Sequence, residues 1–171
     1  EPWRATIPTT TDDLTFIDNR RNKGIASHLV YNLGSTTATS PADSKWRVTL
    51  GLQDNGTRVR QGSGAALQTS GVFEDQIGGD GFGTLIHPVN GDLMLGSIYY
   101  TRIYKSTNGG ATAFTPASTG ITESNDSANT PFAPKIAFGA STTPDTVYTF
   151  VNKKVYKSTN FGDSWSAMSM T

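Results

Sequence analysis

Short apolar runs separated by polar turns cover most of this chain. The runs are brief, and each is followed by residues that favour turns, namely Gly, Asn, Asp, Ser or Pro; they lie at 28–33, 46–52, 84–87, 93–95, 135–138 and 146–151. Brief apolar runs bounded by turn residues are typical of β-strands. No segment keeps the 3.6-residue period of an amphipathic helix. We therefore predict an all-β fold.

Two stretches of the chain nearly repeat each other. Residues 103–110 read Ile-Tyr-Lys-Ser-Thr-Asn-Gly-Gly, and residues 155–162 read Val-Tyr-Lys-Ser-Thr-Asn-Phe-Gly. Each pattern predicts a strand, a turn closed by Ser and Asn side chains, and a glycine with positive φ. An aromatic residue, Phe114 or Trp165, follows each turn. We expect Ser158 and Asn160 to bond within their own turn and Trp165 to be buried.

A longer period links these stretches to the rest of the chain. Asp43, Asp92 and Asp145 fall 49 and 53 residues apart, each just before an apolar run. With the repeated strand and the strand after it, each unit has four strands in about 50 residues, the period of a propeller blade. We predict approximate blades at 26–75, 78–118 and 130–171, with 1–25 as a lead-in from a preceding blade.

The repeated turns also resemble a known motif, Ser-x-Asp-x-Gly-x-Thr/Ser-Trp, which is the Asp-box or BNR repeat of sialidase-like and sortilin-like (VPS10-type) β-propellers. The matching residues are Ser106, Asn108, Gly110 and Thr112 in the first copy and Ser158, Asn160, Gly162, Ser164 and Trp165 in the second. Asn replaces Asp in both copies, and Ala113 stands where the first copy would have its aromatic residue. The resemblance implies β-propeller blades of four antiparallel strands. Because propellers close with roughly 4–8 blades, it implies a partial or multi-chain propeller.

Two glycine-rich segments resemble parts of large secreted BNR proteins. They read Gly-Leu-Gln-Asp-Asn-Gly-Thr at 51–57 and Gly-Gly-Asp-Gly-Phe at 78–82. By analogy they lie at the mouth of the propeller channel, which makes Gln53, Asp54, Asn55, Asp80 and Phe82 candidate ligand-binding residues. The alternative is that Asp54 and Asp80 only accept backbone N–H bonds within glycine-rich turns.

Composition and charge exclude several classes of function. Lys plus Arg equals Asp plus Glu at 14 each, so no broad field attracts nucleic acid or an acidic membrane. Cysteine is absent, and no apolar run approaches the roughly 20 residues of a membrane span. The two histidines stand in different units, so neither a histidine-based zinc site nor a Ser-His-Asp triad is supported, and we name no catalytic residue, metal ligand or cofactor. One alternative stays open, Ca²⁺ held by Glu123, Asp126 and carbonyls of the loop 119–130.

Two functional classes remain. We favour a non-catalytic binding or scaffold propeller, extracellular or on the cell surface of a bacterium, with a glycan or protein ligand. The alternative is part of a sialidase- or xyloglucanase-like glycoside hydrolase, with Glu74, Asp75 and Asp80 as its close carboxylates. In either class, Trp46, Tyr99 and Tyr100 could stack on sugar rings or pack between sheets. We expect no hydrolysis by this chain alone. We expect the remainder of the propeller, from another chain, another copy or further residues, as its partner, because open blades expose strand edges.

Overall fold

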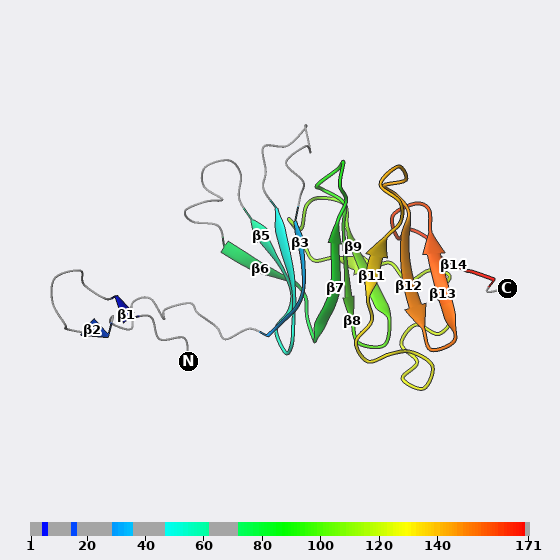
Figure 1. Cartoon of the computed structure of the whole chain (residues 1–171), viewed down its shortest axis with the longest axis horizontal. Coiled ribbons are helices and arrows are strands. Elements are labelled where there is room, and N and C mark those ends of the chain that lie inside the picture. The colour runs from blue at the N-terminus through cyan, green and yellow to red at the C-terminus, as the bar shows by residue number, and fades with distance from the viewer. Residues whose placement is uncertain (1–4, 7–14, 17–28, 36–46, 62–71, 170–171) are drawn as a thin grey trace.

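The computed structural model describes residues 5–6, 15–16, 29–35, 47–61 and 72–169. These residues contain no helix and form three four-stranded antiparallel sheets and a short ribbon (Figure 1). The ribbon pairs β1 (Ala5–Thr6) with β2 (Thr15–Phe16). The first sheet contains β3 (Val30–Ser35), β4 (Val48–Leu52), β5 (Gly56–Gln61) and β6 (Val72–Ile77). The second contains β7 (Gly81–Ile86), β8 (Met94–Ile98), β9 (Arg102–Ser106) and β10 (Thr115–Pro116). The third contains β11 (Ile136–Phe138), β12 (Val147–Val151), β13 (Lys154–Ser158) and β14 (Ser166–Ala167).

Within each sheet, neighbouring strands in sequence are neighbours in space. The sheets themselves lie face to face in chain order, as Figure 1 shows along the long axis of the molecule. Strand β7 contacts both β3 and β11, so the first strands of the sheets lie near one another. Four-stranded meanders stacked in this way are the units of a β-propeller. The predicted all-β fold of four-stranded antiparallel sheets is confirmed.

Apolar side chains fill the two spaces between the sheets. The cluster between the first and second sheets comprises Val59, Ile77, Ile86, Met94, Ile98 and Phe114. The cluster between the second and third comprises Leu95, Ile103, Ala117, Ile121, Ile136, Val147, Val151, Tyr156, Phe161 and Trp165. Because side chains alternate along each strand, the second sheet has apolar side chains on both faces: Met94 faces the first sheet and Leu95 faces the third.

One expected boundary was wrong. The sequence predicts that the second unit starts with a strand at 84–87, after a glycine-rich turn, but β7 already begins at Gly81. At Gly81 and Gly83 the backbone of a neighbouring sheet comes so close that a side chain would not fit. A Cβ on Gly81 would lie 2.3 Å from the Gly56 oxygen, and one on Gly83 would lie 2.9 Å from the Ile136 nitrogen. These glycines therefore allow close packing of the three sheets.

None of the residues described here belongs to a helix long and apolar enough to cross a membrane.

Candidate functional site

The two glycine-rich segments of the sequence meet in the structure. The hairpin turn between β4 and β5 lies against residues 79–82, and the Gly56 N–H donates to the Gly79 carbonyl at 2.7 Å. The Asp54 N–H donates to Oδ1 of Asp80, also at 2.7 Å. A Cβ on Gly51 would lie 2.3 Å from the Phe82 oxygen, so this close approach requires glycine. The fold therefore brings all five candidate ligand-binding residues to one place.

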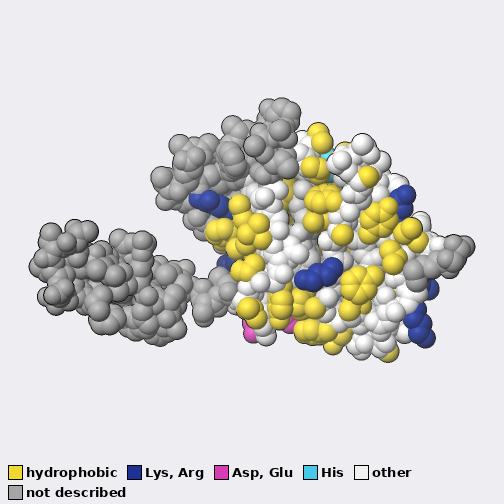
Figure 2. Space-filling view, viewed as in Figure 1, with side chains coloured by type: hydrophobic (Ala, Val, Ile, Leu, Met, Phe, Trp, Pro, Cys, Tyr) yellow, Lys and Arg dark blue, Asp and Glu magenta, His cyan; other side chains and the backbone are white. Residues whose placement is uncertain are grey.

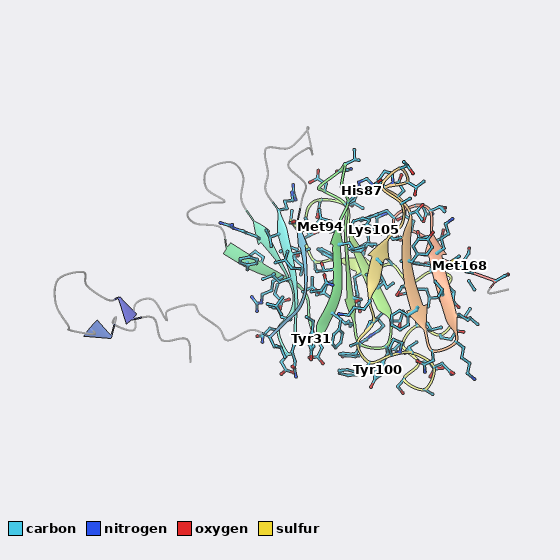
Figure 3. The ribbon with its side chains drawn as sticks, viewed as in Figure 1. Tyr31, His87, Met94, Tyr100, Lys105 and Met168 are labelled. Carbon is cyan, nitrogen blue, oxygen red and sulfur yellow. The ribbon has the colours of Figure 1, made fainter. Side chains whose placement is uncertain are left out.

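Aromatic rings from the first two sheets and from the loop before β11 gather beside this hairpin. Phe82 of β7 packs between Tyr31 of β3 and Phe132, with ring centroids 4.9 and 5.4 Å away. Phe132 also lies 6.1 Å from Tyr99, nearly parallel to it, and 5.8 Å from Tyr100. We call these five residues, together with the turn at 53–55 and Asp80, the aromatic edge. Figure 3 shows Tyr31 and Tyr100 at the lower end of the sheets, opposite His87.

The rings of the aromatic edge differ in their access to solvent. Phe132 is 53% exposed and Tyr31 38%, whereas Phe82 is buried beneath them. Tyr99 and Tyr100 are half-buried. Figure 2 shows apolar side chains along the lower border of this face, with acidic side chains beside them. Phe82 thus supports the surface from below, and the exposed rings are Tyr31 and Phe132.

Polar groups surround these rings in a defined arrangement. The Tyr31 hydroxyl donates to Oε1 of Gln53, and Nδ2 of Asn55 donates to the Gln53 carbonyl. Asp80 accepts a backbone N–H bond, as the structural alternative predicts. The Asp54 carboxylate, in contrast, is exposed and has no hydrogen-bond partner within the described part of the chain.

The backbone of both hairpin turns at the aromatic edge is unusual. Asp54 has φ 58°, and Tyr100 and Thr101, between β8 and β9, have φ 62° and 52°. Positive φ is uncommon for residues other than glycine, although Asp and Asn adopt it more often than the rest. At Tyr100 and Thr101 it stores conformational strain, which is concentrated at functional sites in proteins.

The repeated turns lie at the other end of the sheets. In the second, Ser158 Oγ donates to Oδ1 of Asn160 and accepts the N–H bonds of Asn160 and Gly162. Asn160 also accepts the Ser164 N–H and donates to its hydroxyl. In the first turn, Ser106 Oγ likewise donates to Oδ1 of Asn108 and accepts the N–H bonds of Asn108 and Gly110, and Nδ2 of Asn108 donates to the Thr112 hydroxyl. Oδ1 of Asn108 accepts the Ala111 N–H, one position earlier than in the second turn. The hydrogen bonds predicted within these turns are present.

Trp165, which follows the second turn, is 3% exposed and its Nε1 donates to the Ala117 carbonyl at 2.8 Å. Phe114, which follows the first turn one position later, is buried between the first and second sheets. These turns therefore fix the outer part of the core.

The recurring aspartates join neighbouring sheets. Arg47, which directly precedes β4 of the first sheet, donates to Asp92 at 2.6 Å. Nε2 of His87, which directly follows β7 of the second sheet, pairs with Asp145 at 3.1 Å. Nδ1 of His87 accepts the N–H bonds of Val89 and Asn90, which places the ring proton on Nε2 and makes His87 the donor to Asp145. Asp43 lies outside the described residues. The aspartate period thus has a structural role.

The loop at 119–130 is held by protein contacts. Glu123 accepts bonds from Lys154 and from the hydroxyls of Tyr156 and Thr122. The Lys154 ammonium, and then the Tyr156 and Thr122 hydroxyls, lower the pKa of the Glu123 carboxyl to about 2. Asp126 accepts bonds from Asn129 and Ala128, and these lower its pKa. Within the described ranges, no three acidic, histidine or cysteine side chains lie close enough to hold a metal ion.

Two other candidate residues, Glu74 and Asp75, stand on β6, at the opposite edge of the first sheet from β3. The Asp75 carboxylate lies beside the β4–β5 hairpin, because a Cβ on Gly56 would be 2.9 Å from its Oδ1. Trp46 lies outside the described residues. The sequence reasoning missed Tyr31 and Phe132, because neither belongs to a motif and only the stacking of sheets brings them together.

Comparison with known proteins supports the fold. No protein-family model matches the chain, and no curated protein matches it significantly. Among solved structures, the chain is similar to the crystal structure of an ancestral GH74 enzyme, with a TM-score of 0.56 and 20% sequence identity. The similarity covers 82% of this chain but only 18% of that enzyme. GH74 is a glycoside hydrolase family with a β-propeller fold. At this identity the likeness shows a shared propeller fold, of which this chain spans less than a fifth.

Proposed function

We propose that this chain is part of an extracellular Asp-box propeller that binds a neutral oligosaccharide at its aromatic edge. The observation that carries this proposal is the continuous aromatic cluster with two exposed rings, Phe132 and Tyr31, beside Asp54, Asp80 and Gln53. Sugar rings present C–H groups on their faces and hydroxyls around their rims. Aromatic faces attract the former, and carboxylates and amides bond the latter.

The charge at this edge favours a neutral ligand. Asp54 is an exposed carboxylate, and Asp80 lies beside it. The Arg102 guanidinium lies 4.3 Å from the centre of the Tyr99 ring, where the ring face attracts the cation. A sialidase-type site needs a cluster of arginines for the sugar carboxylate, whereas this edge presents acidic groups and Arg102 stacked on an aromatic ring. Neutral β-linked or α-linked glucans, xylans and xyloglucan are therefore the first ligands to test.

The assignment to Asp-box propellers is part of the proposal. It is supported by the pair of turns with the same hydrogen bonds at a 52-residue interval, and by the fold shared with the GH74 enzyme. Asn108 and Asn160 use their amide groups to donate to Thr112 and Ser164, so Asn can replace the Asp of the motif.

Affinity electrophoresis tests the binding role. The protein runs through gels that contain β-glucan, xyloglucan, xylan or no polysaccharide, and retardation in one gel shows binding. We expect Phe132→Ala to weaken that binding by about fivefold or more, since truncating a stacking aromatic costs more than about 1 kcal/mol. Phe138→Ala is the matched control, because Phe138 is a 40% exposed phenylalanine on β11 and its ring lies beside Phe161 of the second repeated turn, at the other end of the sheets. Absence of retardation in every gel, or equal losses in both variants, would contradict the proposal.

A second candidate function is hydrolysis, and it rests on the adjacency of Asp54 and Asp80 in a fold shared with a glycoside hydrolase. Glycosidases act through two carboxyls about 5–9 Å apart on either side of the scissile bond. A screen with chromogenic glycosides distinguishes the two functions. Turnover that Asp54→Asn or Asp80→Asn abolishes would establish an enzyme, whereas binding without turnover supports the binding role.

A further inference from the structure

One face of the third sheet points away from the rest of the protein. In β12 and β13, strand alternation and pairing place Tyr148, Phe150, Val155 and Lys157 on the same side, opposite the buried Tyr156. Phe150 is exposed, and the other three are half-buried. We call these four residues the outward face of the third sheet.

The matching face of the second sheet is fully covered. Lys157 lies 52 residues after Lys105, and both occupy the same place in the strand before a repeated turn. The pairing of Leu95 with Lys105 corresponds to the pairing of Tyr148 with Lys157. Lys105 is 6% exposed and Leu95 is completely buried, because the third sheet lies on them.

The second repeated turn covers this lysine. Lys105 Nζ donates to Oδ1 of Asp163 at 2.7 Å and approaches the Asn160 carbonyl at 3.4 Å. A Cβ on Gly162 would lie 2.7 Å from the Leu95 side chain, so glycine is needed where the turn touches the second sheet. The turn of each sheet is therefore also its contact with the preceding sheet.

The first repeated turn makes the same contact with different chemistry. It rests on the first sheet, where a Cβ on Gly110 would lie 2.9 Å from Val59. Val59 pairs with Thr49 of β4 and so occupies the register position of Lys105 in its own sheet. The residue after the glycine is Ala111 here and Asp163 in the second turn. The first contact is therefore apolar, at Val59, whereas the second pairs Asp163 with Lys105.

We propose that the outward face of the third sheet docks a further four-stranded sheet whose Asn/Asp-x-Gly turn carries Asp or Glu directly after the glycine. That carboxylate pairs with Lys157, while the turn glycine lies on Tyr148. The first sheet of a second copy does not have this chemistry, because residues 62–71, which connect β5 to β6, contain no acidic residue. The occupant is therefore a sheet of the second-turn type.

The chain itself supplies a probe with this turn. We design an extended protein in which a second copy of residues 118–169 follows Ser169. In that copy, the lysine that corresponds to Lys157 is changed to Arg, so that peptides of the two copies differ in mass. Acetic anhydride labels lysine amines, and mass spectrometry measures the rate at each site. We expect Lys157 to react about fivefold or more slowly in the extended protein, because an ion pair holds its amine. Lys153, exposed in the β12–β13 turn, serves as the control and keeps its rate.

A variant of the extended protein tests the carboxylate. Asp163→Ala in the added copy restores the reactivity of Lys157, and the turn tolerates alanine because Ala111 occupies this position in the first turn. In the original chain, Asp163→Ala likewise speeds the labelling of Lys105. Equal rates for Lys157 with and without the extension, proteolysis of the added copy as an unfolded tail, or no effect of either alanine would overturn the proposal. Protection of Lys157 that rises with the concentration of the original chain would assign the face to a second copy and overturn it as well.

Discussion

Truncation of the Trp165 side chain is expected to destabilise the protein strongly. Its side chain is 3% exposed in the core between the second and third sheets. Its indole N–H bonds the Ala117 carbonyl, and its backbone N–H bonds the Thr119 carbonyl. The ring therefore fixes the segment that leads from β10 towards β11 as well as the second repeated turn.

The expected loss for Trp165→Ala follows from this burial. A buried tryptophan removes about 150–250 Å² from water, and at about 25 cal/mol per Å² this range gives about 4–6 kcal/mol before correction for a compact unfolded state. The Ala117 carbonyl also loses its partner, which costs about 1 kcal/mol. We expect the free energy of unfolding to fall by about 3–5 kcal/mol, as in other large aromatic truncations.

Urea denaturation, followed by circular dichroism, measures this loss. Trp165→Phe is the matched variant, because it keeps a ring in the core but removes the N–H donor, and we expect it to lose about 1–2 kcal/mol. The midpoint should shift without a change in slope, since the surface exposed on unfolding stays similar. A loss below about 1 kcal/mol for Trp165→Ala would refute the reasoning and place the ring outside the core.

Two further predictions concern the turns and the loop. Gly162→Ala should destabilise by more than about 1 kcal/mol, because its φ is +86° and the added methyl meets Leu95; Gly78→Ala, with open space around it, should not. Glu123→Gln should show a pH-dependent cost in urea midpoints. The folded-state pKa of Glu123 lies below its ordinary value of 4.5, so its contribution is complete above that pH and is lost as the pH falls towards about 2. A cost that is constant from pH 7 to pH 2 would contradict the role of Lys154.

The fold could be predicted from the sequence because its signals are local. Ser158, Asn160 and Gly162 close their turn with bonds to residues two to four positions away, so the turn chemistry is readable wherever it occurs. The recurrence of Asp92 and Asp145 was also visible. Their partners Arg47 and His87 were not, because these contacts span 45 and 58 residues between sheets.

The candidate site was only half predictable. The glycine-rich segments mark Asp54 and Asp80, since close backbone approach requires glycine. Tyr31 and Phe132 carry no such mark. They lie about a hundred residues apart and meet only across Phe82, once three sheets have stacked. Likewise, the contact of Glu123 with Lys154 joins residues 31 positions apart and has no signal in the sequence.

The central claim is that oligosaccharide binds across the aromatic edge, and aromatic-ring NMR during a titration tests it most directly. The probe is the shortest soluble oligosaccharide of whichever polysaccharide retards the protein. We expect saturable shifts of the ring signals of Tyr31, Tyr100 and Phe132, with Tyr148 and Phe150 of the outward face unchanged. Shifts confined to Tyr148 and Phe150, or saturating binding that leaves the signals of Tyr31 and Phe132 unmoved, would contradict it.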